Sequence, residues 1–231
     1  MKQLENEKVA LRQVETGSAR GALKHVSNEK GSAAIFLLWI MTVIIVLTVI
    51  IVNIAKVYAV KQQASTAAQL GAFAATSEIL LATEEGIKEF DEYMMEKALE
   101  AGVEYEPLWD EIDERKDSYM ASDVGEQEAY IKALNEILPG SLGNPILKGY
   151  LFIDSALSTK IYSTVQNVVR ENEGNEEHLE IVISEEKYRV EVKTDATYET
   201  IGSGEYIDSF QKDIPEIGYG PELSYLQYVL N

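Results

Sequence analysis

The strongest structural signal in the chain is the run "KGSAAIFLLWIMTVIIVLTVIIVNIAKVYAVKQQ" at residues 30–63, which holds 24 consecutive uncharged positions at residues 32–55. A helix rises about 1.5 Å per residue, so about 20 apolar residues match a hydrocarbon core of roughly 30 Å. A cleaved secretory signal has a shorter apolar core of about 7–15 residues. The alternative is a buried core helix, but soluble domains rarely need a run of this length. The pattern therefore predicts a transmembrane helix over residues 32–55.

The charges on either side of this helix indicate its orientation. Three basic residues, Arg20, Lys24 and Lys30, lie just before it, and two, Lys56 and Lys61, follow it. Short cytoplasmic segments keep an excess of Lys and Arg, and the long acidic part of the chain lies after the helix. We therefore expect residues 1–31 to be a disordered cytoplasmic leader at the cell membrane. The rest of the chain is expected to be extracytoplasmic, with the lipid bilayer as its first partner.

The overall charge and the absence of cysteine exclude several classes of function. The chain of 231 residues has 39 acidic and 20 basic side chains, a formal net charge of -19. A body this acidic repels phosphate backbones, which argues against nucleic acid as a partner. Because the chain contains no cysteine, neither disulfides nor thiol chemistry contribute.

A second helical pattern follows the apolar helix without a break. The segment "KVYAVKQQASTAAQLGAFAATSEILLAT" contains no proline, and the first proline of the chain is Pro107. We therefore expect a stalk helix over residues 56–82 that continues the transmembrane helix. Small residues recur along it at helical spacing, namely Ala64, Ala67, Ala68, Gly71, Ala74 and Ala75. Such a stripe lets another helix approach closely, which predicts packing against a partner helix or a second copy. The alternative is packing on the chain's own domain.

These two patterns together resemble the N-terminal segment of TadE/TadG-like proteins of the Flp (tight-adherence) pilus system. The family pattern is a glycine, an apolar span, an aspartate, basic residues around a tyrosine, a glutamine and an alanine-rich run. The matching positions are Gly31, Lys56, Tyr58, Lys61, Gln62 or Gln63, Ala67, Ala68, Ala72 and Ala74. Asn53 and Gln69 stand where the family usually has aspartate. The resemblance implies a pseudopilin-like membrane protein that packs with other pilus or secretion components through its N-terminal helix.

The resemblance also implies a candidate processing site between Gly31 and Ser32. Prepilin processing cuts after a glycine and favours a glutamate as the fifth residue of the mature chain. This chain has Phe36 at that position. We therefore expect the leader to be retained.

The remaining residues predict further helices followed by a small sheet. Helical spacing recurs in residues 83–145, interpreted as a helical insertion, and in the first part of residues 146–231. The period then changes to two in "KYRVEVKT", where Tyr188, Val190 and Val192 alternate with charged residues and predict a half-buried strand. Its expected antiparallel partner is "LEIVIS", and "ATYETI" is expected to add a third strand. Residues 146–231 are thus predicted to form a head of one helix plus an antiparallel meander, and the fold class is α+β and pilin-like.

The C-terminal segment "DIPEIGYGPELSYLQYVLN" is unusually rich in apolar and aromatic residues for a chain end. A free tail of this composition would expose a patch of the kind that soluble domains avoid. We expect it to fold back over the sheet as part of the core, with Pro215 and Pro221 in its turns. The alternative is a docking strip built on Tyr219, Tyr225 and Tyr228.

The sequence offers little that could catalyse a reaction. The two histidines, His25 and His178, lie on opposite sides of the apolar span, and zinc is not expected without cysteines or clustered histidines. The acidic run "DEIDERKD" lacks the alternating carboxylates and the glycine of a calcium loop. After Asp154, Ala156 stands where a von Willebrand A-type metal site needs serine. We therefore predict no catalytic residue, no cofactor, no metal and no small-molecule substrate.

Two functions are compatible with these patterns. The leading prediction is a non-enzymatic, single-pass membrane component of a Flp/Tad-type pilus or secretion assembly, with an acidic extracytoplasmic head. The alternative is a membrane-tethered extracellular binding or sensor module unrelated to pili.

Overall fold

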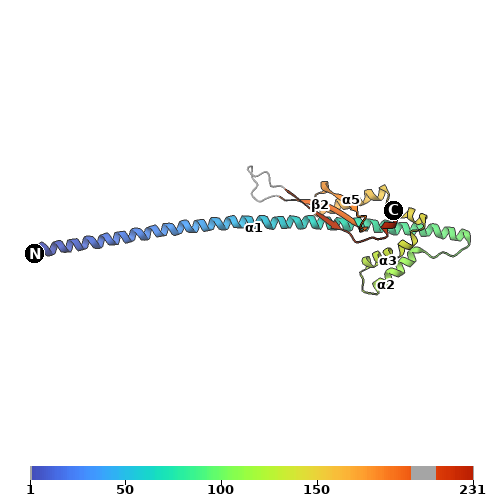
Figure 1. The fold of residues 1–231 in the computed structure, drawn as a ribbon, viewed down its shortest axis with the longest axis horizontal. Coiled ribbons are helices and arrows are strands. Elements are labelled where there is room, and N and C mark those ends of the chain that lie inside the picture. The colour runs from blue at the N-terminus through green and yellow to red at the C-terminus, as the bar shows by residue number, and fades with distance from the viewer. Residues whose placement is uncertain (1, 199–211, 231) are drawn as a thin grey trace. The chain divides into compact units, whose positions relative to one another are not determined.

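The computed structural model describes the backbone of residues 2–198 and 212–230, and the side chains of residues 31–198 and 212–230. The chain divides into two compact units, Met1–Ala55 and Lys56–Asn231, and we call the second unit the body. In chain order the elements are α1 (Lys2–Ala101), α2 (Leu108–Met120), α3 (Glu126–Ser141), α4 (Pro145–Tyr150), α5 (Ser155–Glu171), the 3₁₀ turn η1 (Glu176–His178), β1 (Glu180–Ile183), β2 (Val190–Tyr198), β3 (Lys212–Tyr219) and α6 (Leu226–Leu230) (Figure 1). Because helices and an antiparallel sheet share the body, the predicted α+β fold class is confirmed.

Helix α1 is longer than the sequence pattern predicts. It begins at Lys2, so the backbone of the leader is helical where disorder is expected. The leader has no proline and is rich in Lys, Glu, Leu and Ala, which favour helices. The helix also passes residue 82 without a break and ends at Ala101, where Gly102 has φ 65°, a left-handed conformation that commonly ends helices. The insertion predicted at residues 83–145 therefore begins with the last turns of α1.

The core of the body forms around the part of α1 that belongs to it. Ile79, Ile87 and Phe90 of α1 face inwards and are each at most 5% exposed. Figure 1 draws α5 on one side of this helix and α2 with α3 on the other. The largest fully buried side chains are those of Tyr225, Ile87, Ile112, Leu134, Leu138, Leu147, Leu223, Leu226, Val165, Val169, Val190 and Val192. They come from both sides of α1 and from the C-terminal segment, so one core holds these elements together.

The sheet has the strand order β1–β2–β3, and both strand pairs are antiparallel. The predicted hairpin of "LEIVIS" with "KYRVEVKT" is confirmed, with Ile181 opposite Val192. The third strand predicted at "ATYETI" is not separate in its described part, because "ATY" belongs to β2, which ends at Tyr198. Residues 199–201 of that prediction lie outside the described residues. The third strand is β3. Its Pro215 lies within the strand and forms no turn, and proline is tolerated there because β3 is an edge strand of the described sheet.

Two side-chain caps divide the helix predicted after residue 145. The Asn144 side chain accepts a hydrogen bond from the N–H of Ile146 at 2.9 Å, and α4 begins there. The Asp154 side chain accepts one from the N–H of Leu157 at 2.7 Å, and α5 begins there. Each cap satisfies an N–H group that has no partner inside its own helix. The predicted single helix is therefore two helices.

The buried carboxylate of Asp91 joins α1 to α2. It accepts hydrogen bonds from the N–H groups of Leu108 at 2.9 Å and Trp109 at 2.8 Å, and from the Tyr105 hydroxyl at 2.6 Å. Pro107, which precedes α2, makes no side-chain cap. Asp91 therefore satisfies the first donors of α2 from a different helix, which fixes where α2 starts relative to α1.

The C-terminal segment belongs to the core, as predicted. Leu223, Tyr225, Leu226 and Val229 are each at most 2% exposed. The Tyr225 hydroxyl lies 2.9 Å from the Oγ1 atom of Thr83 on α1, so this end of the chain is bonded to the central helix of the body. A docking strip that uses Tyr225 would require the core to open.

Buried tyrosines predict that the body loses stability in alkaline solution. Burial is the largest of the causes that raise the pKa of Tyr105, Tyr130 and Tyr225 well above the usual value of about 10. A raised folded-state pKa means that the folded chain holds the phenolic proton more tightly, so the stabilisation is complete below about pH 10 and is lost as the pH rises further. We expect the urea midpoint to be constant from about pH 8 to pH 9 and to fall above about pH 10. Tyr225→Phe should flatten this fall, and a midpoint that does not change up to about pH 11 would contradict the burial of these hydroxyls.

Candidate membrane anchor and helix-packing face

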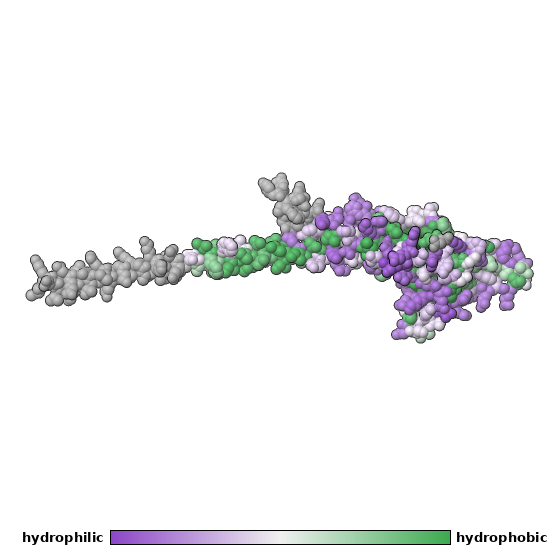
Figure 2. Space-filling model, in the orientation of Figure 1, coloured by the Kyte–Doolittle hydropathy of each residue, from purple (hydrophilic) through white to green (hydrophobic). Residues whose placement is uncertain are grey.

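The apolar part of α1 exposes its side chains in every direction. All residues from 31 to 52 are exposed, including Trp39 at 71% and Phe36 at 65%. On the face drawn in Figure 2, the surface of this segment is mostly apolar. Soluble domains rarely expose so large an apolar area. Among the residues described, α1 is the one helix long and apolar enough to cross a membrane, so it fits a membrane anchor.

Three polar side chains of this part of α1 are bonded to their own helix. The hydroxyls of Thr42 and Thr48 donate to the carbonyl oxygen four residues earlier, at 2.9 Å and 2.8 Å. The Asn53 side-chain amide does the same at 3.0 Å. Each bond pairs a donor that a hydrocarbon environment would otherwise leave unsatisfied. Gly31 and Ser32, the candidate processing residues, lie exposed on the same helix.

The stripe of small residues lies inside the body. Its positions on α1 are the fully buried Ala64, Ala67, Ala68 and Ala75, the buried Gly71 and the partly exposed Ala74. A Cβ atom at Gly71 would lie 3.2 Å from the Cγ1 atoms of Val165 on α5 and Val192 on β2, and 3.3 Å from the Cγ2 atom of Val169. Helix α5 and strand β2 therefore approach α1 as closely as a residue without a side chain allows.

Strand β3 approaches the stripe even more closely. A Cβ atom at Gly218 would overlap the backbone carbonyl of Ala68. The neighbouring Gln69 side chain bonds to the free edge of this strand: its Nε2 donates to the Tyr219 carbonyl at 2.7 Å, and its Oε1 accepts from the Tyr219 N–H at 3.3 Å. Gln69 thus occupies the place that another strand would take at this point of the sheet edge.

These contacts correct the expectation that the stripe meets a partner helix. While the body is folded, Ala67 and Ala68 have no exposed surface and are covered by the chain's own residues. The structure supports the alternative interpretation, in which the stripe packs on its own domain. The outer face of this part of α1 instead exposes Leu70, Phe73 and Leu81, which recur at helical spacing.

A polar cluster in the body has no counterpart among the sequence predictions. His178 Nδ1 lies 2.8 Å from Asp195 Oδ2, and Asp213 completes a group of three ligand atoms within 4.8 Å of one another. The spacing along the chain gives no signal, because the group depends on strand pairing that places Thr197 opposite Asp213. The alternation in β2 places Asp195 and Thr197 on one face, and from this signal only Asp195, one of the three residues, could be found.

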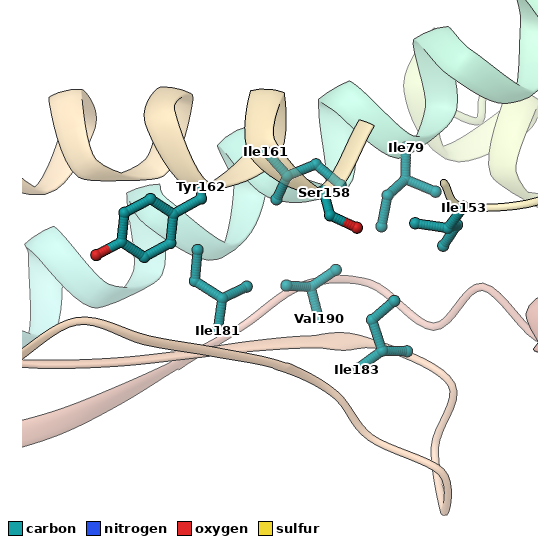
Figure 3. A pocket seen from close by; sticks show the side chains of 8 residues that line it. All are labelled: Ile79, Ile153, Ser158, Ile161, Tyr162, Ile181, Ile183 and Val190. Carbon is teal, nitrogen blue, oxygen red and sulfur yellow. The ribbon is translucent and has the colours of Figure 1, made fainter. Parts of the chain in front are cut away.

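A small apolar pocket lies between α5 and the sheet (Figure 3). Its volume is about 210 Å³, and its lining residues are Ile79, Ile153, Ser158, Ile161, Tyr162, Ile181, Ile183 and Val190. Ligand sites for drug-sized molecules usually have volumes of about 300–1,000 Å³ and several converging polar groups. This pocket has room for a small apolar group at most, so no substrate is assigned to it.

The first part of α1 fits a membrane anchor, and its later part forms the centre of the α+β body. These two features define the class of protein to which the structure corresponds. Residues 31–78 match the family model described as "Putative Flp pilus-assembly TadE/G-like". The resemblance to TadE/TadG-like proteins is therefore confirmed over this segment, which contains both the apolar residues and the stripe. No curated protein and no solved structure matches the chain.

Proposed function

We propose that the chain is a non-enzymatic, single-pass membrane component of a Flp-type pilus or secretion assembly. The observation that carries the proposal is the family match at residues 31–78, which begins at the exposed apolar segment and extends along the stripe on which α5 and the sheet pack. A protein with this design acts by placing a folded domain at a membrane surface and by contacting neighbouring components. Neither task needs a catalytic centre.

The proposed orientation places the leader in the cytoplasm and the body outside. Lys24 and Lys30 precede the apolar segment, and basic residues next to a span tend to stay in the cytoplasm. Most of the 39 acidic residues of the chain follow the span. The partners in this proposal are lipid and other membrane components of the assembly, which meet the exposed faces of α1, since its stripe is already covered.

The function is tested by deleting the gene in cells that naturally make the chain and counting surface pili by electron microscopy. We expect pili to be lost, and to return when the full chain is restored. A chain with Ile44→Arg and Leu47→Arg should not restore them, because each arginine at the centre of a span costs about 2.5–3.5 kcal/mol in insertion. The matched control is the volume-conserving pair Ile44→Leu and Leu47→Ile, which should restore pili.

Normal pili in the deletion strain would contradict the proposal. They would favour the second candidate, a membrane-tethered extracellular binding or sensor module. The observation in its favour is the apolar pocket of about 210 Å³ between α5 and the sheet, which has room for a small apolar group. The two functions share the anchor and the orientation, so the count of pili separates them.

We expect the bond between Gly31 and Ser32 to remain intact. The apolar Phe36 occupies the position at which prepilin processing favours glutamate. The intact mass of the protein purified from membranes of its own host should therefore include residues 1–31. A mature chain that begins at Ser32 would show that the peptidase accepts Phe36, and Phe36→Ala would then be the matched test of that position.

A further inference from the structure

Three side chains with metal-binding chemistry meet at one end of the sheet. His178 comes from η1, Asp195 from the central strand β2 and Asp213 from the start of β3. Asp195 is opposite Pro215 and Thr197 is opposite Asp213, so the two aspartates lie diagonally on the same face of the sheet. The ligand atoms of all three residues lie within 4.8 Å of one another.

One of the two oxygens of the buried Asp195 carboxylate has no hydrogen-bond partner among the described residues. The residue is 7% exposed, and the oxygen in question is its buried Oδ1 atom. Its Oδ2 atom contacts His178 Nδ1 at 2.8 Å, which is a contact inside the cluster. A buried charge costs several kcal/mol unless it is paired or coordinates a cation.

Asp213 adds to the negative charge that the cluster leaves uncompensated. It adds a second carboxylate to the cluster, where the Thr197 hydroxyl donates to its Oδ1 at 2.9 Å. Two carboxylates this close repel each other, and a cation between them removes the repulsion. The other side of the cluster is open, because His178 and Asp213 are both exposed. An ion can therefore enter from solvent and keep water as its remaining ligands.

We propose that His178, Asp195 and Asp213 bind one divalent first-row transition-metal ion, of which Zn²⁺ is the best match. The donor set is one imidazole and two carboxylates, and imidazole favours Zn²⁺, Ni²⁺ and Cu²⁺ over Mg²⁺ and Ca²⁺. Two ligand atoms at about 2.1 Å from a tetrahedral ion lie about 3.4 Å apart, so a shift of roughly 1–1.5 Å by the exposed side chains completes the site. The ion ties η1 to β2 and β3.

Zinc binding is tested on the full chain in detergent, purified without a polyhistidine tag, by calorimetric titration with ZnCl₂ and by metal analysis after dialysis. We expect one Zn²⁺ per chain. His178→Ala and Asp195→Asn should each weaken binding by more than about 100-fold, since even residues behind a ligand contribute about 10–100-fold. The matched controls are His25→Ala, the other histidine of the chain, and Asp110→Asn, an exposed aspartate on α2. Both should bind as the parent chain does.

Thermal unfolding separates a metal site from a hydrogen-bonded pair. With Zn²⁺ at about 100 times its Kd, the melting temperature should exceed that in EDTA by roughly 5–10 °C. This shift should vanish in Asp213→Asn, whose exposed position leaves the fold intact. Absence of binding up to about 1 mM Zn²⁺, or equal binding by His178→Ala and the parent, would overturn the proposal.

Discussion

A chain that lacks residues 222–231 is expected not to fold its body. The deletion removes Leu223, Tyr225, Leu226 and Val229, each at most 2% exposed. Burying such a side chain stabilises a fold by about 1.5–3 kcal/mol, so the four together contribute about 6–12 kcal/mol. Domains have total stabilities of about 5–15 kcal/mol, which the loss would largely cancel. Circular dichroism of the full chain in detergent should therefore show no cooperative melting of the truncated body.

The matched control for this deletion is Tyr228→Ala. Tyr228 lies in the same segment but is 45% exposed, so its removal should change the stability by about 0.5 kcal/mol or less. A truncated chain that melts within a few degrees of the parent would mean that the segment is not part of the core. The docking-strip interpretation would then account for its apolar residues.

Gly71→Leu is expected to destabilise the body rather than to disturb assembly alone. A Cβ atom at this position already comes within 3.2 Å of Val165 and Val192, and leucine adds three more carbon atoms. Overpacking of a filled core usually costs about 1–3 kcal/mol and sometimes more. The melting temperature should fall by about 3–10 °C or further, since a change of 1 kcal/mol shifts it by about 2–4 °C in a chain of this size.

The matched control is Ala59→Leu, a small-to-large change at an exposed position of the same helix. It should leave the melting temperature within about 2 °C of the parent. If Gly71→Leu melted like Ala59→Leu but lost crosslinks to membrane partners, the stripe would face a partner helix after all. If the melting temperature falls in Gly71→Leu but not in Ala59→Leu, the stripe lies in the core of the chain's own body.

The sequence predicts the elements whose signal is local. The apolar helix depends on the composition of consecutive residues, and the β1–β2 hairpin depends on alternation across a short turn. The third strand is predicted at the wrong place, because Val190, Val192, Ala196 and Tyr198 continue one buried face and do not show where β2 ends. Strand β3 contains Pro215, which argues against a strand unless its edge position is known.

The sequence shows that something packs closely on the stripe, but it cannot show what. Small residues at helical spacing indicate that another element packs closely, but they do not identify that element. The neighbours of Gly71 lie more than 90 residues further along the chain, in α5 and β2. The group of His178, Asp195 and Asp213 is hidden for the same reason, since only the register of β2 with β3 brings its carboxylates together. Both features are set by long-range packing.

Single-cysteine labelling tests most directly whether α1 crosses the membrane with the body outside. The chain has no cysteine, so Ser27→Cys in the leader and Ser122→Cys after α2 each create one reactive thiol. Ser122 is exposed, and its thiol should react with a membrane-impermeant maleimide added to cells whose cytoplasmic membrane is intact. The thiol at position 27 should react only after the membrane is permeabilised. Labelling of position 27 in intact cells, with position 122 protected, would contradict the account.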